Sequence, residues 1–278
     1  MGQSVITLNN GVRIPQCGFG VFQVPPSDTQ AAVEQAIEIG YRHIDTAAAY
    51  NNEAGVGAAV RASGLPREEL FVTTKLRNGE HGYESALRAY DETLERLGLD
   101  YVDLYLLHWP NPAADRYVDS WRALERIYTD ARVRAVGVSN FLAEHLDRLA
   151  KESELVPAVN QIELHPTYQQ HDLTELCRER SIAVEAYSPL GQGGDLDHPV
   201  LASIADDHHV SPAQVVLRWH LHLGHIVIPK SVNPERIRAN FELGGFELTD
   251  AEIASVAALE NGNRLGNDPR TFAISQIR

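Results

Sequence analysis

The stretch LFVTTKLRNGEHGYESALRAYDETLERLGLDYVDLYLLH, residues 70–108, holds two apolar runs on either side of a segment with helical spacing. The runs are Leu70–Lys75 and Val102–His108. Runs that are apolar almost throughout are typical of strands buried on both faces in a parallel sheet that helices cover. The stretch is therefore expected to form a strand, a helix and the next strand.

The same alternation continues along the chain. Short β-branched or apolar runs recur about 30 residues apart, which is the size of a strand-plus-helix unit. The segments between them place apolar residues at i, i+3 and i+4, as Val33, Ala36 and Ile37 do. The eight predicted strands are Cys17–Phe22, His43–Asp45, Leu70–Lys75, Val102–His108, Val133–Val138, Ala158–Ile162, Ala183–Tyr187 and Ile226–Ile228.

Eight such units fit either a doubly wound open sheet or a closed (β/α)8 barrel. A dinucleotide-binding open sheet would carry a glycine-rich phosphate loop after its first strand. The sequence has Gly18-Phe19-Gly20, but Gln23 stands where the third glycine should be, and no GxxxxGK[ST] loop occurs. The pattern therefore favours a single (β/α)8 TIM barrel, with residues 1–278 as one domain.

Two additions to this barrel are expected. Residues 5–8 and 12–14, on either side of Asn10-Gly11, are typical of a β-hairpin, which could close one end of the barrel. The gap between the seventh and eighth runs has room for two helices, so one or two helices should be extra. Capping boxes that start helices are predicted at Ser27 with Gln30, Ser211 with Gln214, and Thr249 with Glu252.

Composition and charge exclude several classes of protein. The 278 residues are 44% hydrophobic and 22% charged, as in ordinary soluble globular proteins. The net charge of −14 argues against binding to nucleic acid or anionic membranes, which requires a basic surface. No stretch approaches the roughly 20 apolar residues of a membrane span. The start, MGQSVITLNN, shows no secretory signal, and Cys17 and Cys177 are expected to be buried thiols, so a cytoplasmic protein is expected.

Polar residues gather where the predicted strands end, and the active sites of barrels lie at the carboxyl ends of their strands. Any one of these residues has an ordinary explanation as the border of a core, but their convergence on one rim is less expected by chance. The residues are Asp45, Tyr50 shortly after it, Lys75, His108, Ser139, Asn140, Asn160 and Gln161.

Aspartate, lysine, tyrosine and histidine together suit proton transfer to a carbonyl. A free tyrosine has a pKa of about 10, which a neighbouring ammonium would lower. A carboxylate would keep the lysine charged, and an imidazole can orient a carbonyl by a hydrogen bond. None of these groups is a strong covalent nucleophile, so the electrons are expected to come from a hydride cofactor.

Three segments of the chain resemble the aldo-keto reductase family. They are GYRHIDTA at 40–47 with Glu53 and Gly57 after it, RAVGVSNF at 134–141, and IPKS at 228–231 with Arg236 and Asn240 after it. The resemblance covers nearly the whole chain and is greatest to short prokaryotic 2,5-diketo-D-gluconate reductase-like members. It implies a TIM barrel, usually monomeric, that reduces small aldehydes and ketones with NADPH. Substrates of the 2,5-diketo-D-gluconate or methylglyoxal type are included in this expectation.

The resemblance also implies roles for individual residues. The catalytic residues would be Tyr50 as proton donor, Lys75 and Asp45 as the groups that tune it, and His108 as the group that orients the carbonyl. The substrate pocket would be lined by Phe22, Arg77 and Trp109.

The NADPH contacts are implied in the same way. Ser139, Asn140 and Gln161 would bind the nicotinamide carboxamide, and Tyr187 would stack on the ring. Lys230, Ser231 and Arg236 would hold the 2′-phosphate, because two cations and a hydroxyl suit a phosphate better than a ribose hydroxyl. The remaining expected contacts are Gly20, Val21, Phe22, Ser188, Leu190, Gly191, Gln192, Val232 and, toward adenine, Asn240.

Two positions depart from the pattern of the family. Ala239 stands where many relatives have a glutamate that contacts adenine, which puts the preference for NADPH over NADH in question. Arg77 stands where relatives usually have a tryptophan. The hypothesis is that Arg77 opens the pocket and favours carboxylate-bearing or strongly polar carbonyl compounds.

Two other functions remain open from the sequence. The chain could be a non-catalytic, nucleotide-sensing member of the same fold, although the complete set of four catalytic residue types argues against this. It could also be a barrel isomerase or aldolase that uses Lys75 as a Schiff base. His220, His222 and His225 suggest a metal cluster, but their spacing gives only the last two as helix neighbours, so no metal is expected.

Overall fold

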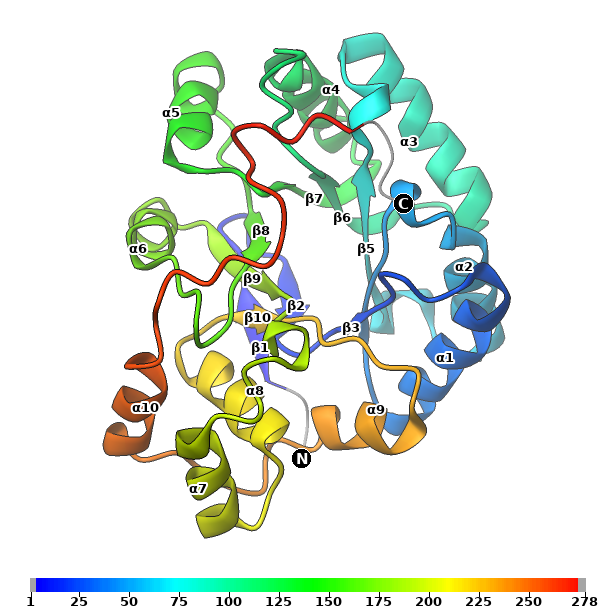
Figure 1. The fold of residues 1–278 in the computed structure, drawn as a ribbon. Helices are drawn as coiled ribbons and strands as arrows, with labels where there is room; N and C mark the ends of the chain where they lie inside the picture. Colours follow the sequence, from blue (N-terminus) through cyan, green and yellow to red (C-terminus); the bar gives the residue numbers. More distant parts are fainter. Residues whose placement is uncertain (1–3, 275–278) are drawn as a thin grey trace.

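Eight parallel strands form a closed barrel with helices around it (Figure 1). The computed structural model describes residues 4–274. Each strand pairs with the next one along the chain, and a parallel bridge between Cys17 and Val227 joins the first barrel strand to the last. The predicted (β/α)8 fold is therefore confirmed. The strands are β3 (Phe19–Gly20), β4 (His43–Asp45), β5 (Phe71–Leu76), β6 (Val102–Leu107), β7 (Val133–Ser139), β8 (Val159–Glu163), β9 (Ala183–Tyr187) and β10 (Ile226–Val227).

The first barrel strand is shorter than the sequence predicts. The apolar run covers residues 17–22, whereas β3 has only two residues. Backbone hydrogen bonds continue beyond the strand at both ends: Gly18 N donates to Val227 O at 2.7 Å, and Val21 N donates to Asp45 O at 3.1 Å. The run therefore lines the barrel seam even where it is not a regular strand.

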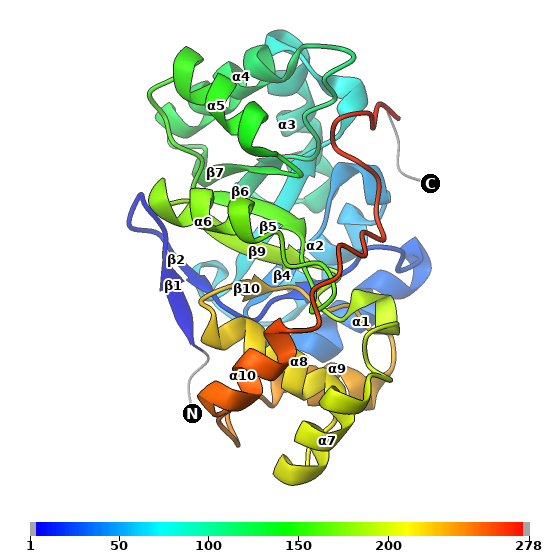
Figure 2. The same cartoon turned by 60° about the vertical axis from the view of Figure 1, so that its left-hand side comes forward.

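An N-terminal hairpin covers one end of the barrel. Its strands, β1 (Val5–Thr7) and β2 (Arg13–Pro15), pair antiparallel, as predicted. Leu8 and Ile14 are buried and pack in one cluster with Phe71 and other apolar residues of the barrel strands. Figure 2 shows the hairpin and the C-terminal segment on opposite sides of the barrel.

Most of the hydrophobic core lies between the barrel and the surrounding helices. Two of these helices are extra to the barrel, because α7 shares the β9–β10 connection with α8, and α10 follows α9. No helix within residues 4–274 has the length and apolar character needed to cross a bilayer. The helices are α1 (Pro26–Ile39), α2 (Glu53–Ala62), α3 (Tyr83–Leu97), α4 (Tyr117–Thr129), α5 (Ala143–Glu152), α6 (His171–Glu179), α7 (Pro199–His208), α8 (Pro212–His222), α9 (Pro234–Phe241) and α10 (Asp250–Ala257).

Two of the three predicted capping boxes are present, and one prediction is wrong. Ser211 with Gln214 starts α8, and Thr249 with Glu252 starts α10. Ser27 does not cap α1, because the helix already begins at Pro26. The fixed φ of a proline suits the first helical position, so this proline moves the helix start ahead of the serine.

Gly57 allows α2 to pack directly on the end of α3. A Cβ atom added at this position would lie 1.7 Å from the carbonyl oxygen of Leu97, which is backbone and cannot move aside as a side chain can. We expect Gly57→Ala to destabilise the protein by about 3 kcal/mol, the upper part of the usual range for overpacking. Urea unfolding followed by circular dichroism measures this change.

The matched control is Gly244→Ala. This glycine is exposed, and a Cβ added to it would meet no atom within 4 Å. Its effect should stay within about 0.5 kcal/mol, as for other surface substitutions. Equal stability of the two variants would contradict the close packing of α2 on α3.

Candidate active site

The four predicted catalytic residues come from three neighbouring strands and the segments after them. Asp45 ends β4, Lys75 lies near the end of β5, and His108 directly follows β6. Tyr50 ends the short 3₁₀ helix η1 (Ala48–Tyr50). Parallel neighbours end on the same rim of a barrel, and the structure accordingly brings these side chains together.

Lys75 and Asp45 form a fully enclosed ion pair. The ammonium Nζ of Lys75 donates to both carboxylate oxygens of Asp45, at 2.7 and 2.8 Å, and to the carbonyl oxygen of Thr46 at 2.9 Å. Neither side chain is more than 3% exposed. All three ammonium protons therefore have acceptors, which is the condition under which a buried charge is tolerated.

The ring of Tyr50 packs beside this pair. Lys75 Nζ lies 5.1 Å from the centre of the Tyr50 ring, and the ring of His108 stands edge-on at 5.6 Å. Phe22 covers Tyr50 with a ring separation of 5.0 Å. The arrangement gathers a phenol, an ammonium and an imidazole at the same point of the rim.

The expectation that Lys75 lowers the pKa of Tyr50 is wrong for this arrangement. Desolvation, followed by the negative charges of Asp45 and Glu185, raises the pKa of Tyr50 well above its usual value. The main physical reason is the removal of the phenolate from water, and the carboxylate of Asp45, which is paired with Lys75, adds to the rise. Tyr50 therefore stays protonated at neutral pH and can act as a hydrogen-bond donor.

His108 is a neutral imidazole at neutral pH. Burial, and then the positive charge of Lys75, lowers the pKa of His108 well below its usual value. A neutral ring carries one N–H that can donate to a carbonyl oxygen. This property suits the orienting role that the family resemblance implies.

The residues predicted to bind the nicotinamide lie beside the catalytic four and are bonded to each other. Asn140 Nδ2 donates to the carbonyl oxygen of His108 at 2.9 Å, and its Oδ1 accepts from the Tyr187 hydroxyl at 2.8 Å. Ser139 Oγ donates to the backbone oxygen of Gln161 at 2.8 Å. The ends of β7, β8 and β9 thus form one polar wall of the site.

The predicted pyrophosphate loop follows β9 directly. Ser188, Gly191 and Gln192 all have positive φ values, 48°, 54° and 52°, so the backbone turns back on itself. Leu190 lies within the same turn. At Gly191 an added Cβ would lie 2.7 Å from Asp195, so glycine is required there by space as well as by φ.

A buried acidic cluster that the sequence did not reveal supports this loop. His165 Nδ1 contacts Asp195 Oδ2 at 2.9 Å, and His165 Nε2 contacts Glu163 Oε1 at 3.3 Å. Burial alone would lower the pKa of His165, but these two hydrogen bonds raise it to about 9. Glu163 also accepts from the backbone N–H groups of Leu265 and Gly266, so the cluster ties the C-terminal segment to the loop.

The predicted 2′-phosphate residues surround the start of α9. Lys230 and Arg236 are exposed, and neither forms an ion pair with any of residues 4–274. Ser231 is half-buried, Val232 is 56% exposed, and Asn240 is buried. The first barrel strand approaches from the other side, because an added Cβ at Gly20 would lie 2.8 Å from the carbonyl oxygen of Ile228. Val21 is buried beside this glycine.

The C-terminal segment covers Trp109, one of the residues predicted to line the substrate pocket. Phe272 packs on Trp109 with ring centres 4.3 Å apart, and Figure 1 shows this segment crossing the barrel toward α3 and α4. Sequence reasoning missed Phe272, because nothing local indicates where the segment runs. Arg77 is paired with Glu80 at 3.1 Å, so its charge is partly balanced.

The histidine prediction is wrong in its pairing. His220 and His225 approach each other, with Nδ1 atoms 3.3 Å apart, whereas His222 is exposed. The helix ends at His222, and the turn through Gly224 brings His225 back against His220. Both thiols, Cys17 and Cys177, are buried as predicted.

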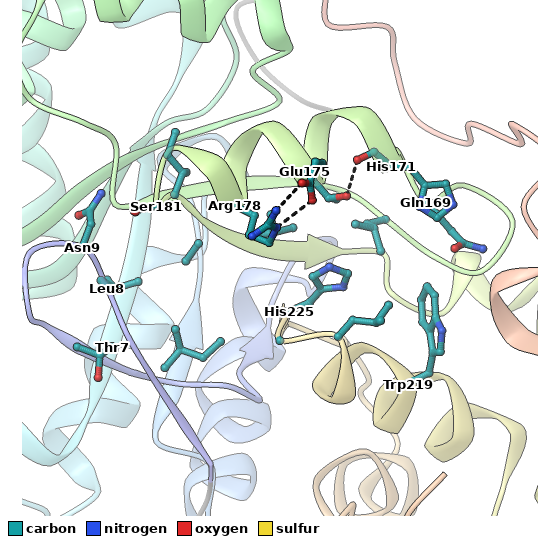
Figure 3. Close-up of a pocket in the computed structure, with 18 of the residues that line it drawn as sticks. Thr7, Leu8, Asn9, Gln169, His171, Glu175, Arg178, Ser181, Trp219 and His225 are labelled. Atoms are coloured by element: carbon teal, nitrogen blue, oxygen red, sulfur yellow. Dashed lines mark hydrogen bonds and ion pairs between the residues drawn. The ribbon is translucent and has the colours of Figure 1, made fainter. Parts of the chain in front are cut away.

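A cavity of about 490 Å³ lies away from the catalytic four, at the hairpin end of the molecule (Figure 3). It is bounded by Thr7, Leu8 and Asn9 of the hairpin segment, by α6, and by Trp219 of α8. The ion pair of Glu175 and Arg178 lies on its α6 side. This cavity contains none of the predicted catalytic residues and belongs to a different part of the surface.

Fold and site together define a barrel whose carboxyl rim carries a phenol donor, a buried ion pair and a neutral imidazole. Residues 17–261 match the model of the aldo/keto reductase family, and the chain belongs to that family.

Relatives and solved structures agree over almost the full length. The chain is 52% identical to morphine 6-dehydrogenase of Pseudomonas putida, over 98% of this chain and 97% of that protein. It is 47% identical to glyoxal reductase of Bacillus subtilis, over 96% of each. A solved structure of a Gox0644 variant in complex with NADPH is 44% identical, with a TM-score of 0.94, over 98% of this chain and 99% of that one.

Proposed function

We propose that this chain is an NADPH-dependent oxidoreductase that reduces small aldehydes and ketones to alcohols. The observation that carries the proposal is the packing of Tyr50 and His108 on the enclosed Lys75–Asp45 pair. Glyoxal reductase and an NADPH-bound structure among the relatives support it. The absence of a free nucleophile in this group of side chains favours reduction over covalent catalysis.

Each residue has a stated part in this reaction. NADPH, when bound, supplies the hydride that reaches the carbonyl carbon. Tyr50 gives its phenolic proton to the carbonyl oxygen as negative charge develops there. His108 donates a hydrogen bond to the same oxygen and holds the carbonyl in line. Lys75, held by Asp45, places a positive charge beside the phenolate that Tyr50 becomes.

The residues proposed to hold NADPH fit it in charge and in backbone shape. Gly191 lies in a tight turn where a side chain has no room, so backbone can approach a pyrophosphate there. Lys230 and Arg236 offer cations without an ion-pair partner in residues 4–274, at the start of α9, where barrels commonly bind phosphate. Tyr187, whose hydroxyl donates to Asn140 Oδ1 at 2.8 Å, would stack on the nicotinamide ring.

We expect Arg236→Ala to raise the KM for NADPH tenfold to a hundredfold and to leave the KM for NADH unchanged. A hydrogen bond to a charged group contributes about 1.5–3 kcal/mol, and only NADPH carries the 2′-phosphate. Steady-state kinetics with both cofactors measures this change. Ala239, which lacks the glutamate of many relatives, is expected to leave some activity with NADH.

The matched control is Arg238→Ala on the same helix. Arg238 is exposed and pairs with Glu242 at 3.6 Å, so its charge is already used. Its removal should leave both KM values within about twofold. If both variants raised the KM for NADPH equally, the cause would be the loss of positive charge on this helix in general, and Arg236 would not be the phosphate ligand.

The experiment that tests the proposed function follows NADPH absorbance with a panel of small carbonyl compounds. Turnover is expected with simple aldehydes and with dicarbonyls of the methylglyoxal or 2,5-diketo-D-gluconate type. Binding of NADPH without oxidation by any compound would indicate a nucleotide-sensing protein. Trapping of a substrate on Lys75 by borohydride would instead indicate a Schiff-base enzyme. The panel should include acidic and neutral aldehydes, because Arg77 is predicted to line the substrate pocket and to favour acidic compounds.

A further inference from the structure

The side chain of Gln161 has both of its amide protons engaged below the site. Gln161 Nε2 donates to Asp45 Oδ2 at 2.8 Å and to Glu185 Oε2 at 3.0 Å. Its Oε1 atom accepts no hydrogen bond from residues 4–274. An amide held in this way has one polar atom left, and that atom is an acceptor.

Glu185 lies directly beside Gln161 inside the barrel. The two residues are register partners on β8 and β9, so their side chains project from the sheet side by side. Glu185 is completely buried, as is His43, whose Nε2 lies 3.5 Å from Glu185 Oε1. Glu185 is therefore a fully buried neighbour of Gln161 inside the barrel.

The protonation state of Glu185 leaves its contact with Gln161 intact. Burial, and then the charge of Asp45, raises the pKa of Glu185 to about 8. Burial lowers the pKa of His43 to about 3, so its ring is neutral, and its Nε2 contacts Thr73 Oγ1 at 3.1 Å as well as Glu185 Oε1 at 3.5 Å. A proton on Oε1 leaves Oε2 free to accept from Gln161.

We propose that Glu185 is a positioning residue that, together with Asp45, fixes the Gln161 amide so that its oxygen faces the carboxamide N–H₂ of the nicotinamide. A glutamine amide can turn over and exchange its oxygen for its nitrogen. The reversed orientation here would place Oε1 against two carboxyl oxygens and present N–H₂ to another N–H₂. The inference rests on the proposed function, because it needs Gln161 to contact the nicotinamide.

Comparison of two oxidised cofactors tests this inference. NADP⁺ has a carboxamide, whereas 3-acetylpyridine adenine dinucleotide phosphate has a methyl ketone in its place and cannot donate to Gln161. Binding of each is measured by quenching of protein fluorescence. The wild-type protein should bind NADP⁺ about tenfold more tightly, since one hydrogen bond contributes about 1.4 kcal/mol.

Three variants separate orientation of the amide from general damage. Glu185→Met removes the acceptor and should reduce the preference to about twofold or less. Glu185→Gln keeps an oxygen at the same reach and should retain most of it. Gln161→Met should lose the preference, and the double variant with Glu185→Met should lose no more, because the two residues act through one contact.

The comparison remains valid for a less stable variant, because each preference is the ratio of two Kd values, for NADP⁺ and for the acetylpyridine analogue, measured on the same protein. Glu185→Met leaves one buried N–H of Gln161 without its acceptor, which costs stability but does not alter this ratio. If it fails to fold, Glu185→Val repeats the test, since the valine side chain carries no hydrogen-bond acceptor. If Glu185→Met kept the tenfold preference for NADP⁺, the inference about Glu185 would be overturned, while the proposed contact between Gln161 and the nicotinamide would stand. Equal binding of both cofactors by the wild type would overturn the Gln161 contact itself, and the inference with it.

Discussion

Replacing Tyr50 by phenylalanine should lower kcat for carbonyl reduction at least a hundredfold, about the smallest usual contribution of a general acid. The hydroxyl of Tyr50 is the group whose proton neutralises the developing alkoxide. Its raised pKa means that it is fully protonated at neutral pH and loses its proton only to a strongly basic oxygen. Steady-state reduction of a small aldehyde measures the loss, and titration with NADPH should give a Kd close to that of the wild type.

Tyr105→Phe is the matched control for Tyr50→Phe. Tyr105 is completely buried on β6, and its hydroxyl has no hydrogen-bond partner among residues 4–274. Removing this oxygen costs no hydrogen bond, so activity and stability should both be retained. Turnover by Tyr50→Phe above about one tenth of the wild-type rate would contradict the role of Tyr50 as the acid.

Replacing Lys75 by methionine should remove activity and also destabilise the fold by about 3–5 kcal/mol. The second effect arises because breaking a buried ion pair leaves an unpaired charge out of water. In the wild type both Lys75 Nζ and Gln161 Nε2 donate to the Asp45 carboxylate. The variant would leave only the Gln161 hydrogen bond, at 2.8 Å. Urea unfolding measures the stability, and aldehyde reduction measures the activity.

A double variant distinguishes the structural role of Lys75 from its chemical one. Asp45→Asn combined with Lys75→Met removes both charges and should recover most of the lost stability, because no buried ion remains. Activity should stay at least a hundredfold below wild type, since no cation remains beside the Tyr50 ring. Recovery of activity together with stability would show that the ammonium only maintains the fold.

Much of the fold could be predicted because strands and their ends are local patterns. The apolar runs gave seven of the barrel strands almost at their observed positions, and the Ser211 and Thr249 caps lie where their boxes indicate. The cap at Ser27 failed because Pro26 occupies the first helical position. Where two local signals compete, the residue that already has the helical φ decides.

The residues of the candidate site could be predicted from the sequence, but the protonation behaviour of Tyr50 could not. Asp45, Lys75 and His108 could be named because barrel geometry gathers strand ends on one rim. The direction of the Tyr50 pKa shift could not be predicted, because it depends on how completely the folded chain removes the phenol from water and on the nearby charges of Asp45 and Glu185. Glu185 had one local signal, a lone acid within the apolar run Ala183–Tyr187, and its partner was not evident from that run.

The sequence by itself determined the barrel, its hairpin, the family and the identity of the polar residues on the rim. These features depend on residue periodicity and on motifs within short segments. Only the tertiary structure decided which charges meet: Gln161 reaches Asp45 across 116 positions of the chain, and Leu265 N–H reaches Glu163 across 102. The physical reason is that barrel closure brings these groups together out of water. There, the distances between buried groups set their protonation states, and no local sequence pattern encodes those distances.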